Sequence, residues 1–228
     1  MSMNHVLIGL GGTGGNVIRC FRRLICQEFR ANEAPGINIG YLYVDSDGAL
    51  MDANHQGWKV YGRSVQLPIA SQLLIKGENL QGRLDNISAY PGIAQWIGDR
   101  SLWRDVLNSV IGDMLGGQKR RLGRFLLACR VTEFRSQLLN VIAGTIPEGA
   151  SRDITFHVLC GLAGGTGGGT VVDVVSQIRD AYPDASTHRI VIYALLPEHN
   201  PNPKWEQQNY HSNRSEEPSC RERVLRLV

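Results

Sequence analysis

The sequence predicts an α/β domain of three layers, a Rossmann-like arrangement in which helices cover both faces of a mostly parallel sheet. Two apolar runs, residues 4–10 and 154–162, each lead into a glycine-rich stretch and then into a segment of helical periodicity. A third apolar run at residues 37–44 follows the first helix, and right-handed crossovers between such strands make the sheet parallel. The chain has 228 residues, 43% of them apolar, which suffices for one domain with a substantial core.

The first strand–helix–strand unit is defined by its glycines and its apolar periodicity. Residues 4–10 form a strand, the run Gly11-Gly12-Thr13-Gly14-Gly15 turns the chain, and a helix follows over residues 16–29. The side chains expected to face inward from this helix are Val17, Phe21, Leu24 and Ile25. A Pro-Gly pair then interrupts the chain before the second strand at residues 37–44, which ends in the acidic turn Asp45-Ser46-Asp47-Gly48.

The middle of the chain is less regular. Residues 49–90 carry scattered Gly, Asn and Pro between short apolar pieces, so we expect an irregular segment with a short helix or strand. Helical spacing predicts helices at residues 93–96 and 102–115 and one long helix over residues 122–142. We therefore expect residues 49–115 to form an insertion in the α/β domain.

The second unit has the same order around a denser glycine run. An apolar run at residues 154–162, which begins with a buried strand at residues 154–160, leads into Ala163-Gly164-Gly165-Thr166-Gly167-Gly168-Gly169, and a helix follows at residues 171–178. Residues 189–196 are expected to form another buried strand, after which three prolines prevent regular structure. Because the composition changes at residue 214, we expect residues 1–213 to form one domain and residues 214–228 a poorly ordered tail.

Composition and charge disfavour several classes of protein. The net charge of +3 is small and its basic residues are spread along the chain, so nothing points to a nucleic-acid partner. The five cysteines show no paired short spacing, which favours reduced thiols in a cytoplasmic protein over a disulfide framework or a zinc site. We expect no membrane segment, because no apolar run is long enough to cross a bilayer and no secretory signal precedes the first strand.

The two glycine runs predict a phosphate site. Both leave the carboxyl edge of a parallel sheet, where open α/β sheets bind their ligands. Bare backbone amides at the positive end of a helix suit a phosphate, and two such loops on one edge suit a di- or triphosphate. Thr166 adds a hydroxyl donor. Asp45 and Asp47 leave the same edge and are candidates to hold Mg²⁺ partly through water, unless the turn only caps the next segment.

Other interpretations stay open from the residues alone. Gly9-Leu10-Gly11-Gly12-Thr13-Gly14 fits the dinucleotide fingerprint, and Asp45 after the next strand could bind a ribose, as in NAD(P)-dependent oxidoreductases. Such a domain does not need the second loop, however. A P-loop ATPase is disfavoured because no Gly-Lys-Ser or Gly-Lys-Thr occurs. A third possibility is a non-catalytic interaction module that keeps a nucleotide-binding fold without turnover.

At these loops the sequence resembles the tubulin/FtsZ superfamily, and within it the large bacterial tubulin-like proteins. Residues 163–169 follow the tubulin signature of small residue, Gly, Gly, Thr, Gly, small residue, Gly, with Gly168 where Ser or Ala is usual. Residues 11–16, which end in Asn16, are similar to the first phosphate loop of FtsZ. Residues 45–50 are similar to its Asn-Thr-Asp-Ala-Gln-Ala-Leu turn, one residue shorter. The resemblance covers roughly residues 4–213 apart from the insertion.

The resemblance implies a guanine-nucleotide-binding protein that uses GTP/GDP and Mg²⁺ and assembles with itself or with a longer relative into cytoskeletal filaments. Gly117 and Gln118 fall where the family has its γ-phosphate-sensing loop, and Glu206 and Asn209 fall in its ribose region. Asp45 and Asp47 are implied at the metal. The full set implied at the nucleotide is Gly11, Gly12, Thr13, Gly14, Asn16, Gly117, Gln118, Ala163, Gly164, Gly165, Thr166, Gly167, Gly168, Glu206 and Asn209.

The resemblance leaves open whether this chain is an enzyme. In this family a long central helix reads the base, and the loop that ends it supplies acidic residues that activate water in the neighbouring subunit's site. The corresponding Gly-x-x-Asn-x-Asp loop does not occur in this sequence. We therefore expect no catalytic residue in this chain. GTP hydrolysis is expected only on self-assembly, and it is expected to be impaired in so short a chain. We also expect a shortened end near residue 214.

Overall fold

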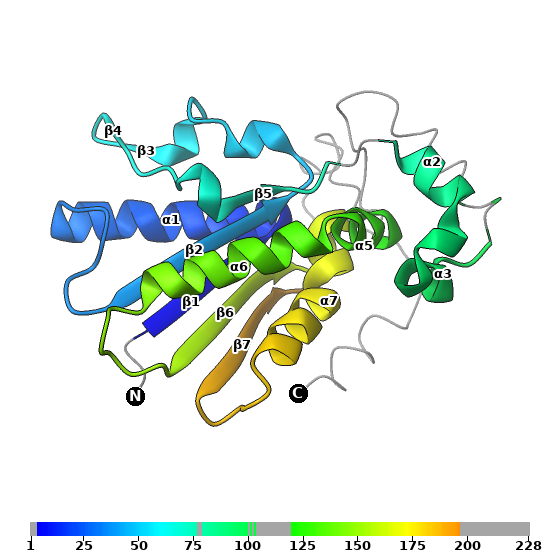
Figure 1. Ribbon diagram of the computed structural model, residues 1–228. Helices are drawn as coiled ribbons and strands as arrows, with labels where there is room; N and C mark the ends of the chain where they lie inside the picture. Colours follow the sequence, from blue (N-terminus) through cyan, green and yellow to red (C-terminus); the bar gives the residue numbers. More distant parts are fainter. Residues whose placement is uncertain (1–3, 77–78, 100, 102, 104–119, 197–228) are drawn as a thin grey trace.

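The computed structural model describes residues 4–76, 79–99, 101, 103 and 120–196. Its centre is a five-stranded parallel sheet in the order β5-β2-β1-β6-β7 (Figure 1). The α/β class and the parallel sheet predicted from the sequence are confirmed. The strands of this sheet are β1 (Asn4–Leu10), β2 (Asn38–Asp45), β5 (Gln72–Leu74), β6 (Ile154–Gly161) and β7 (His188–Leu195).

Helices cover both faces of the sheet, which confirms the three layers (Figure 1). Among the residues that the structure describes, one face carries a single long helix and the other carries three. The helix on the first face is α1 (Gly11–Phe29), and those on the second are α5 (Arg120–Cys129), α6 (Val131–Thr145) and α7 (Gly165–Ala181).

The alternation of side chains along the strands divides the core between these faces. Ile8 of β1 packs with Phe134 of α6 in the larger cluster, on the side of the three helices. Tyr43 of β2 packs with Ile18 of α1 and with Trp58 in a smaller cluster on the opposite side. Each face of the sheet therefore has its own apolar core.

The chain reverses its direction of travel across the sheet between β1 and β6. From β1 it passes through α1 to β2 on one side, and from β6 it passes through α7 to β7 on the other. Ligands of open α/β sheets bind at such a switch point, outside the carboxyl ends of the strands. Leu10 at the end of β1 pairs with Cys160 near the end of β6, so the starts of α1 and α7 adjoin.

Residues 49–115, the segment expected to form an insertion, contain the short strand that we allowed for, but its place in the main sheet was not predicted. β5 pairs with β2 at the edge of the sheet, whereas β3 (Lys59–Val60) and β4 (Arg63–Ser64) form a separate hairpin. Three residues are too few for a period-of-two pattern to be visible in the sequence.

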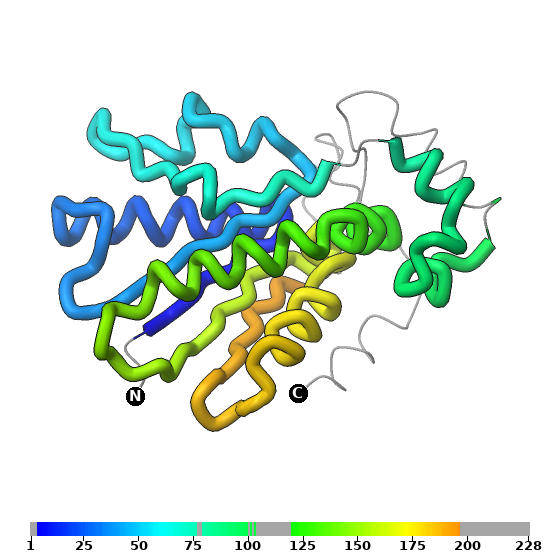
Figure 2. The backbone as a smooth tube through the Cα atoms, viewed as in Figure 1, coloured from blue at the N-terminus to red at the C-terminus, as the bar shows by residue number. Residues whose placement is uncertain are grey.

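Two short helices follow the insertion's strands and lie at one end of the molecule, where the second packs on α5 (Figure 2). They are α2 (Leu80–Asp85) and α3 (Pro91–Ile97), and α3 confirms the helix expected at residues 93–96. The helix expected at residues 102–115 falls outside the described residues except for residue 103, and so does the tail at residues 214–228.

Both long helices of the glycine units begin inside the glycine runs, not after them. α1 begins at Gly11 where a start at residue 16 was predicted, and α7 begins at Gly165 where residue 171 was predicted. Glycine is a poor helix former, so a prediction from helix propensity sets the starts of both helices too far along the chain. Close packing of the first helical turns overrides that preference here.

The inward face of α1 differs in part from the predicted one. Ile25 is buried and Phe21 is half-buried, but Val17 and Leu24 are 44% and 61% exposed. Arg22 is buried instead, because the insertion covers that side of the helix and supplies a carbonyl acceptor for its guanidinium. A periodicity of apolar residues cannot predict that an arginine is buried.

Two other expectations are corrected. The long helix predicted over residues 122–142 is divided into α5 and α6 at Arg130, whose φ of −121° and ψ of 19° are not helical. β7 was expected to be buried, but as an edge strand it has one open face, where Tyr193 and Leu195 are 52% and 65% exposed. Among the described helices, none has the length and apolar character needed to span a bilayer.

Candidate phosphate-binding site

Two helix N-termini meet at the switch point. Gly11 begins α1 directly after β1, and Gly165 begins α7 shortly after β6. The two loops touch, because a Cβ built on Gly11 would lie 2.9 Å from the amide nitrogen of Gly167 and 3.2 Å from the Cβ of Thr166. The φ of Gly11 is +67°, in the left-handed region that glycine adopts without strain. The loops therefore converge on one edge of the sheet, as the sequence predicted.

Most glycines of the two loops are required by packing alone. A Cβ on Gly14 would lie within 3.0 Å of the carbonyl oxygen of Leu159, and a Cβ on Gly15 would lie as close to the ring of Tyr43. Real Cβ atoms do not approach other atoms so closely, so the helices can pack at this distance only on glycine. The same crowding is found in the second loop at Gly167, Gly168 and Gly169.

Gly12 and Gly164 differ from these glycines because the fold leaves room beside them. The nearest atom to a Cβ on Gly12 would be Cδ1 of Leu50 at 3.4 Å, and on Gly164 it would be the carbonyl oxygen of Gly161 at 3.6 Å. Neither glycine has a positive φ. Packing therefore does not explain glycine at these two positions, whereas the close approach of a ligand to the backbone would.

No side chain caps either helix start. The N-cap residues are Leu10 for α1 and Gly164 for α7, neither makes a side-chain capping bond, and neither first turn contains an acidic residue. The first amides of a helix need an acceptor, and the helix dipole adds partial positive charge there. Two such ends in contact form a cradle that suits an anion with adjoining phosphate groups.

Asp45, at the end of β2, is 3% exposed and points into the fold. Its Oδ2 accepts a 2.6 Å hydrogen bond from the Tyr43 hydroxyl, and its Oδ1 accepts from the backbone amides of Ser46 at 2.7 Å and Asp47 at 3.3 Å. Burial raises the pKa of the Asp45 carboxyl, and these bonds partly oppose that rise. In this arrangement Asp45 holds the acidic turn, and its role as a metal ligand stays a prediction.

Asp47 is exposed on the same turn, and its Oδ1 accepts a 2.9 Å hydrogen bond from the amide of Ala49. It thus caps the 3-10 helix Gly48–Met51, which was the simpler alternative for this turn. A second carboxylate oxygen remains that could face a cation. The described residues contain no group of three side chains that could hold a metal by themselves. Mg²⁺ commonly needs only one or two carboxylates beside phosphate oxygens and water.

Ser46 was not among the site residues predicted from the sequence, yet it joins the acidic turn to the second glycine loop. Its Oγ lies 2.8 Å from Oγ1 of Thr166, which is 120 residues away in the chain. Thr166 lies in the first turn of α7 and is 9% exposed. The only sequence signal was the position of Ser46 between two predicted carboxylates.

The start of α5 closes the site on the side of α7. A Cβ on Gly123 would lie within 3.0 Å of the carbonyl oxygen of Gly165, so α5 rests directly on the second loop. Arg124 makes a two-pronged ion pair with Asp173 of α7, at 2.8 and 3.0 Å, which fixes the contact between the two helices. The segment that follows the predicted γ-phosphate loop is therefore docked on the candidate site.

The remaining predicted residues are distributed unevenly. Thr13 lies against the end of β6, since a Cβ on Gly161 would be 2.6 Å from its hydroxyl. Asn16 is exposed on α1, and Ala163 is half-buried just before α7. Four predicted residues lie outside the described part of the chain, namely Gly117, Gln118, Glu206 and Asn209.

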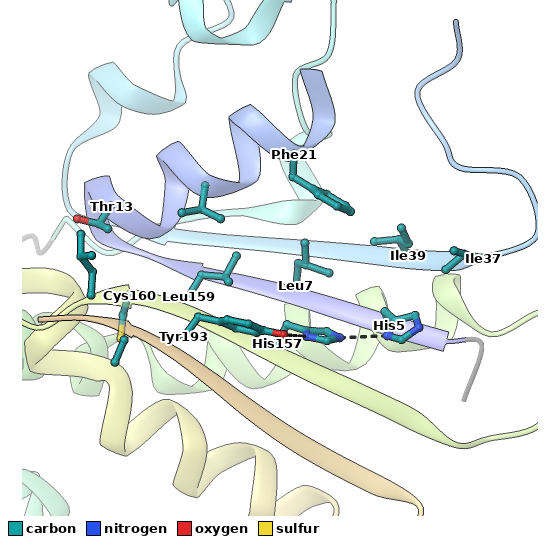
Figure 3. Close-up of a pocket in the computed structure, with 13 residues that line it drawn as sticks. His5, Leu7, Thr13, Phe21, Ile37, Ile39, His157, Leu159, Cys160 and Tyr193 are labelled. Carbon is teal, nitrogen blue, oxygen red and sulfur yellow. Dashed lines mark hydrogen bonds between the residues drawn. The ribbon is translucent and has the colours of Figure 1, made fainter. Parts of the chain in front are cut away.

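A second hollow lies beside α1 on the α1 side of the sheet, lined by residues of α1 and of the strands β1, β2, β6 and β7 (Figure 3). It is an open groove of about 750 Å³ with mostly apolar walls, which include Val17 and Leu159, so it does not suit a phosphate. A polar row crosses its floor (Figure 3): Nδ1 of His5 lies 3.0 Å from Nε2 of His157, whose Nδ1 lies 3.2 Å from the Tyr193 hydroxyl. Burial lowers the pKa of both histidines.

Fold and site together define a Rossmann-like α/β protein with a double glycine cradle at the switch point of its sheet. The model of the family described as tubulin-like matches residues 6–216, and the chain therefore belongs to this tubulin/FtsZ-like family. Comparison with curated proteins gives no match.

Proposed function

We propose that this protein binds GTP or GDP, with the phosphates on the first amides of α1 and α7 and Mg²⁺ beside Asp47. The observation that carries the proposal is the contact between two uncapped helix N-termini, at which Gly12 and Gly164 leave the backbone open. Guanine as the base is supported by membership of the tubulin-like family, which generally binds GTP and GDP.

The surroundings of Asp45 support this proposal over the NAD(P)-dependent alternative. A dinucleotide domain uses the carboxylate after its second strand to bind a ribose. In this chain that carboxylate is 3% exposed and accepts the Tyr43 hydroxyl. Ribose binding would require Asp45 to leave these partners.

We further propose that hydrolysis, where it occurs, depends on association with another subunit, either a copy of this chain or a longer relative. Phosphate release that rises more than linearly with protein concentration would support this, whereas strictly linear release would contradict it. We also propose a cytoplasmic setting, which is consistent with free thiols at Cys20, Cys26, Cys129 and Cys160 in the described part of the chain.

Calorimetric titration with GTP, GDP, ATP and NAD in the presence of Mg²⁺ tests the binding proposal directly. We expect heat of binding with GTP and GDP, and much weaker binding of ATP and NAD. Repeating the GDP titration after removal of Mg²⁺ measures the contribution of the metal. Preferred binding of NAD, or binding of none of the four nucleotides, would refute the proposal.

Two glycine substitutions locate the phosphates. Gly12→Ala and Gly164→Ala fit the fold, since their Cβ atoms would meet other atoms only at 3.4 and 3.6 Å. Each methyl group would occupy the space through which a phosphate reaches the amides, so we expect at least about a tenfold loss of affinity, which is ~1.4 kcal/mol. Gly144→Ala is the matched control because nothing lies within 4 Å of its Cβ position. Unchanged affinity in both test variants would place the phosphates elsewhere.

A further inference from the structure

A row of hydrogen bonds runs from Tyr43, which packs against the first glycine loop, through the acidic turn to the second loop. The ring of Tyr43 lies against Gly15 of the first loop, and its hydroxyl donates to Asp45 at 2.6 Å. Asp45 accepts the backbone amide of Ser46 at 2.7 Å, and the Ser46 hydroxyl lies 2.8 Å from that of Thr166 in the second loop. The row therefore begins against α1 and ends in the first turn of α7.

Three of the four members of this row are buried, and Ser46 is half-buried between them. Tyr43 is 0% exposed, Asp45 is 3% exposed and Thr166 is 9% exposed. A buried polar group that loses its partner keeps the full cost of its desolvation, so each member holds the next in place. The backbone of Ser46 is fixed by the carboxylate of Asp45, and only its hydroxyl reaches across to α7.

The chemistry of two hydroxyls gives this contact a consequence for ligand binding. A hydroxyl has one proton to donate and two lone pairs that accept. When Ser46 donates to Oγ1 of Thr166, the proton of Thr166 is left to donate elsewhere. Thr166 lies among the uncapped amides of α7, so that proton is available to an anion bound there.

We propose that Ser46 is a positioning residue of the phosphate site, which orients the hydroxyl of Thr166 toward a bound phosphate without touching the ligand. The proposal rests on the proposed nucleotide binding. Asp45 in turn positions Ser46, because its buried carboxylate accepts the backbone amide of Ser46, whose hydroxyl contacts Thr166.

A double-substitution cycle tests this role with Mg²⁺–GDP as the probe in calorimetry. The variants are Ser46→Ala, Thr166→Val and the combination. We expect Ser46→Ala to weaken GDP binding about fivefold and Thr166→Val about tenfold or more, since each change removes one hydrogen bond. The double variant is expected to bind no more weakly than Thr166→Val alone, because Ser46 acts only through Thr166.

Two further variants separate positioning from general damage. Ser46→Thr keeps the hydroxyl and is expected to bind GDP nearly as well as the wild type. Ser176→Ala, at an exposed position further along α7, is expected to leave affinity unchanged. Circular dichroism without nucleotide checks that each variant is folded.

The outcomes distinguish the positioning role from nucleotide binding itself. Ser46→Ala is compared in the wild type and in the Thr166→Val variant. If it weakens GDP binding equally in both, Ser46 acts independently of Thr166 and the positioning role is wrong. Unchanged affinity in Ser46→Ala, or no rescue by Ser46→Thr, would also overturn it, while GDP binding by the wild type would stand. A wild-type protein that binds no nucleotide would overturn both proposals.

Discussion

Replacing Gly15 by alanine is expected to destabilise the protein, although alanine is the better helix former. The new Cβ would lie within 3.0 Å of the ring and hydroxyl of Tyr43. Tyr43 is fully buried and its hydroxyl donates to Asp45 at 2.6 Å, so the ring cannot move aside without giving up that bond. The substitution therefore tests whether close helix–sheet packing, and not ligand binding, requires glycine here.

The magnitude follows from three contributions to the free energy of unfolding. Overpacking a filled core costs ~1–3 kcal/mol. Loss of the Tyr43–Asp45 bond with the carboxyl still buried costs a further ~1–3 kcal/mol. The higher helix propensity of alanine returns ~1 kcal/mol. We expect Gly15→Ala to lower the free energy of unfolding by about 1–5 kcal/mol, which is large beside the total stability of an ordinary domain.

Urea denaturation followed by far-ultraviolet circular dichroism, without nucleotide, measures this effect. Gly144→Ala in α6 is the matched control, because its Cβ position has nothing within 4 Å and only the propensity gain of up to ~1 kcal/mol applies. The two variants should therefore shift the midpoint in opposite directions. If Gly15→Ala were as stable as Gly144→Ala, the packing argument for the first glycine loop would be refuted.

Two further predictions concern a buried arginine of α1 and the histidine pair of the open groove. Arg22 is buried, and its Nε donates to the carbonyl of Val65 at 2.5 Å. Arg22→Ala should therefore reduce the free energy of unfolding by ~2–3 kcal/mol, whereas Arg23→Ala, at an exposed position, should leave it nearly unchanged. Equal effects of the two substitutions in urea denaturation would contradict this. Burial lowers the pKa of His5 and His157 below 6.5, so the unfolded chain binds protons that the folded chain does not, and stability should fall as the pH drops through 6.5. His157→Gln should flatten that part of the stability profile, and an unaltered slope would show that the pair is not responsible.

The two strand–glycine–helix units could be predicted because their signals are local. A short apolar run bounded by turn residues indicates a buried strand, and a glycine run indicates a backbone that needs a tight turn or a close approach. A helical period indicates which face of the next segment packs on the sheet. The boundaries were less accurate, since packing drew Gly11 and Gly165 into helices against their propensity. A short helix or strand was expected somewhere in residues 49–90, but β5 could not be located or assigned to the sheet, because three residues carry no period.

The inward face of α1 shows why a local pattern can mislead. Val17 and Leu24 have the apolar character of a core position, but Val17 lines the open groove and Leu24 is exposed. Arg22 has the character of a surface position, yet the insertion covers it and provides its acceptor. Which face is covered depends on segments far away in the chain, and periodicity contains no information about them.

By itself, the sequence determined the α/β class, the parallel sheet and the two glycine loops on one edge, because backbone freedom and side-chain period act over a few neighbouring residues. Only the tertiary structure decided which glycines serve packing and which leave the backbone open, as Gly15 and Gly12 show. It also brought Ser46 to Thr166 across 120 residues. The order of the strands in the sheet decides which distant residues come into contact, and burial of the whole core fixes that order.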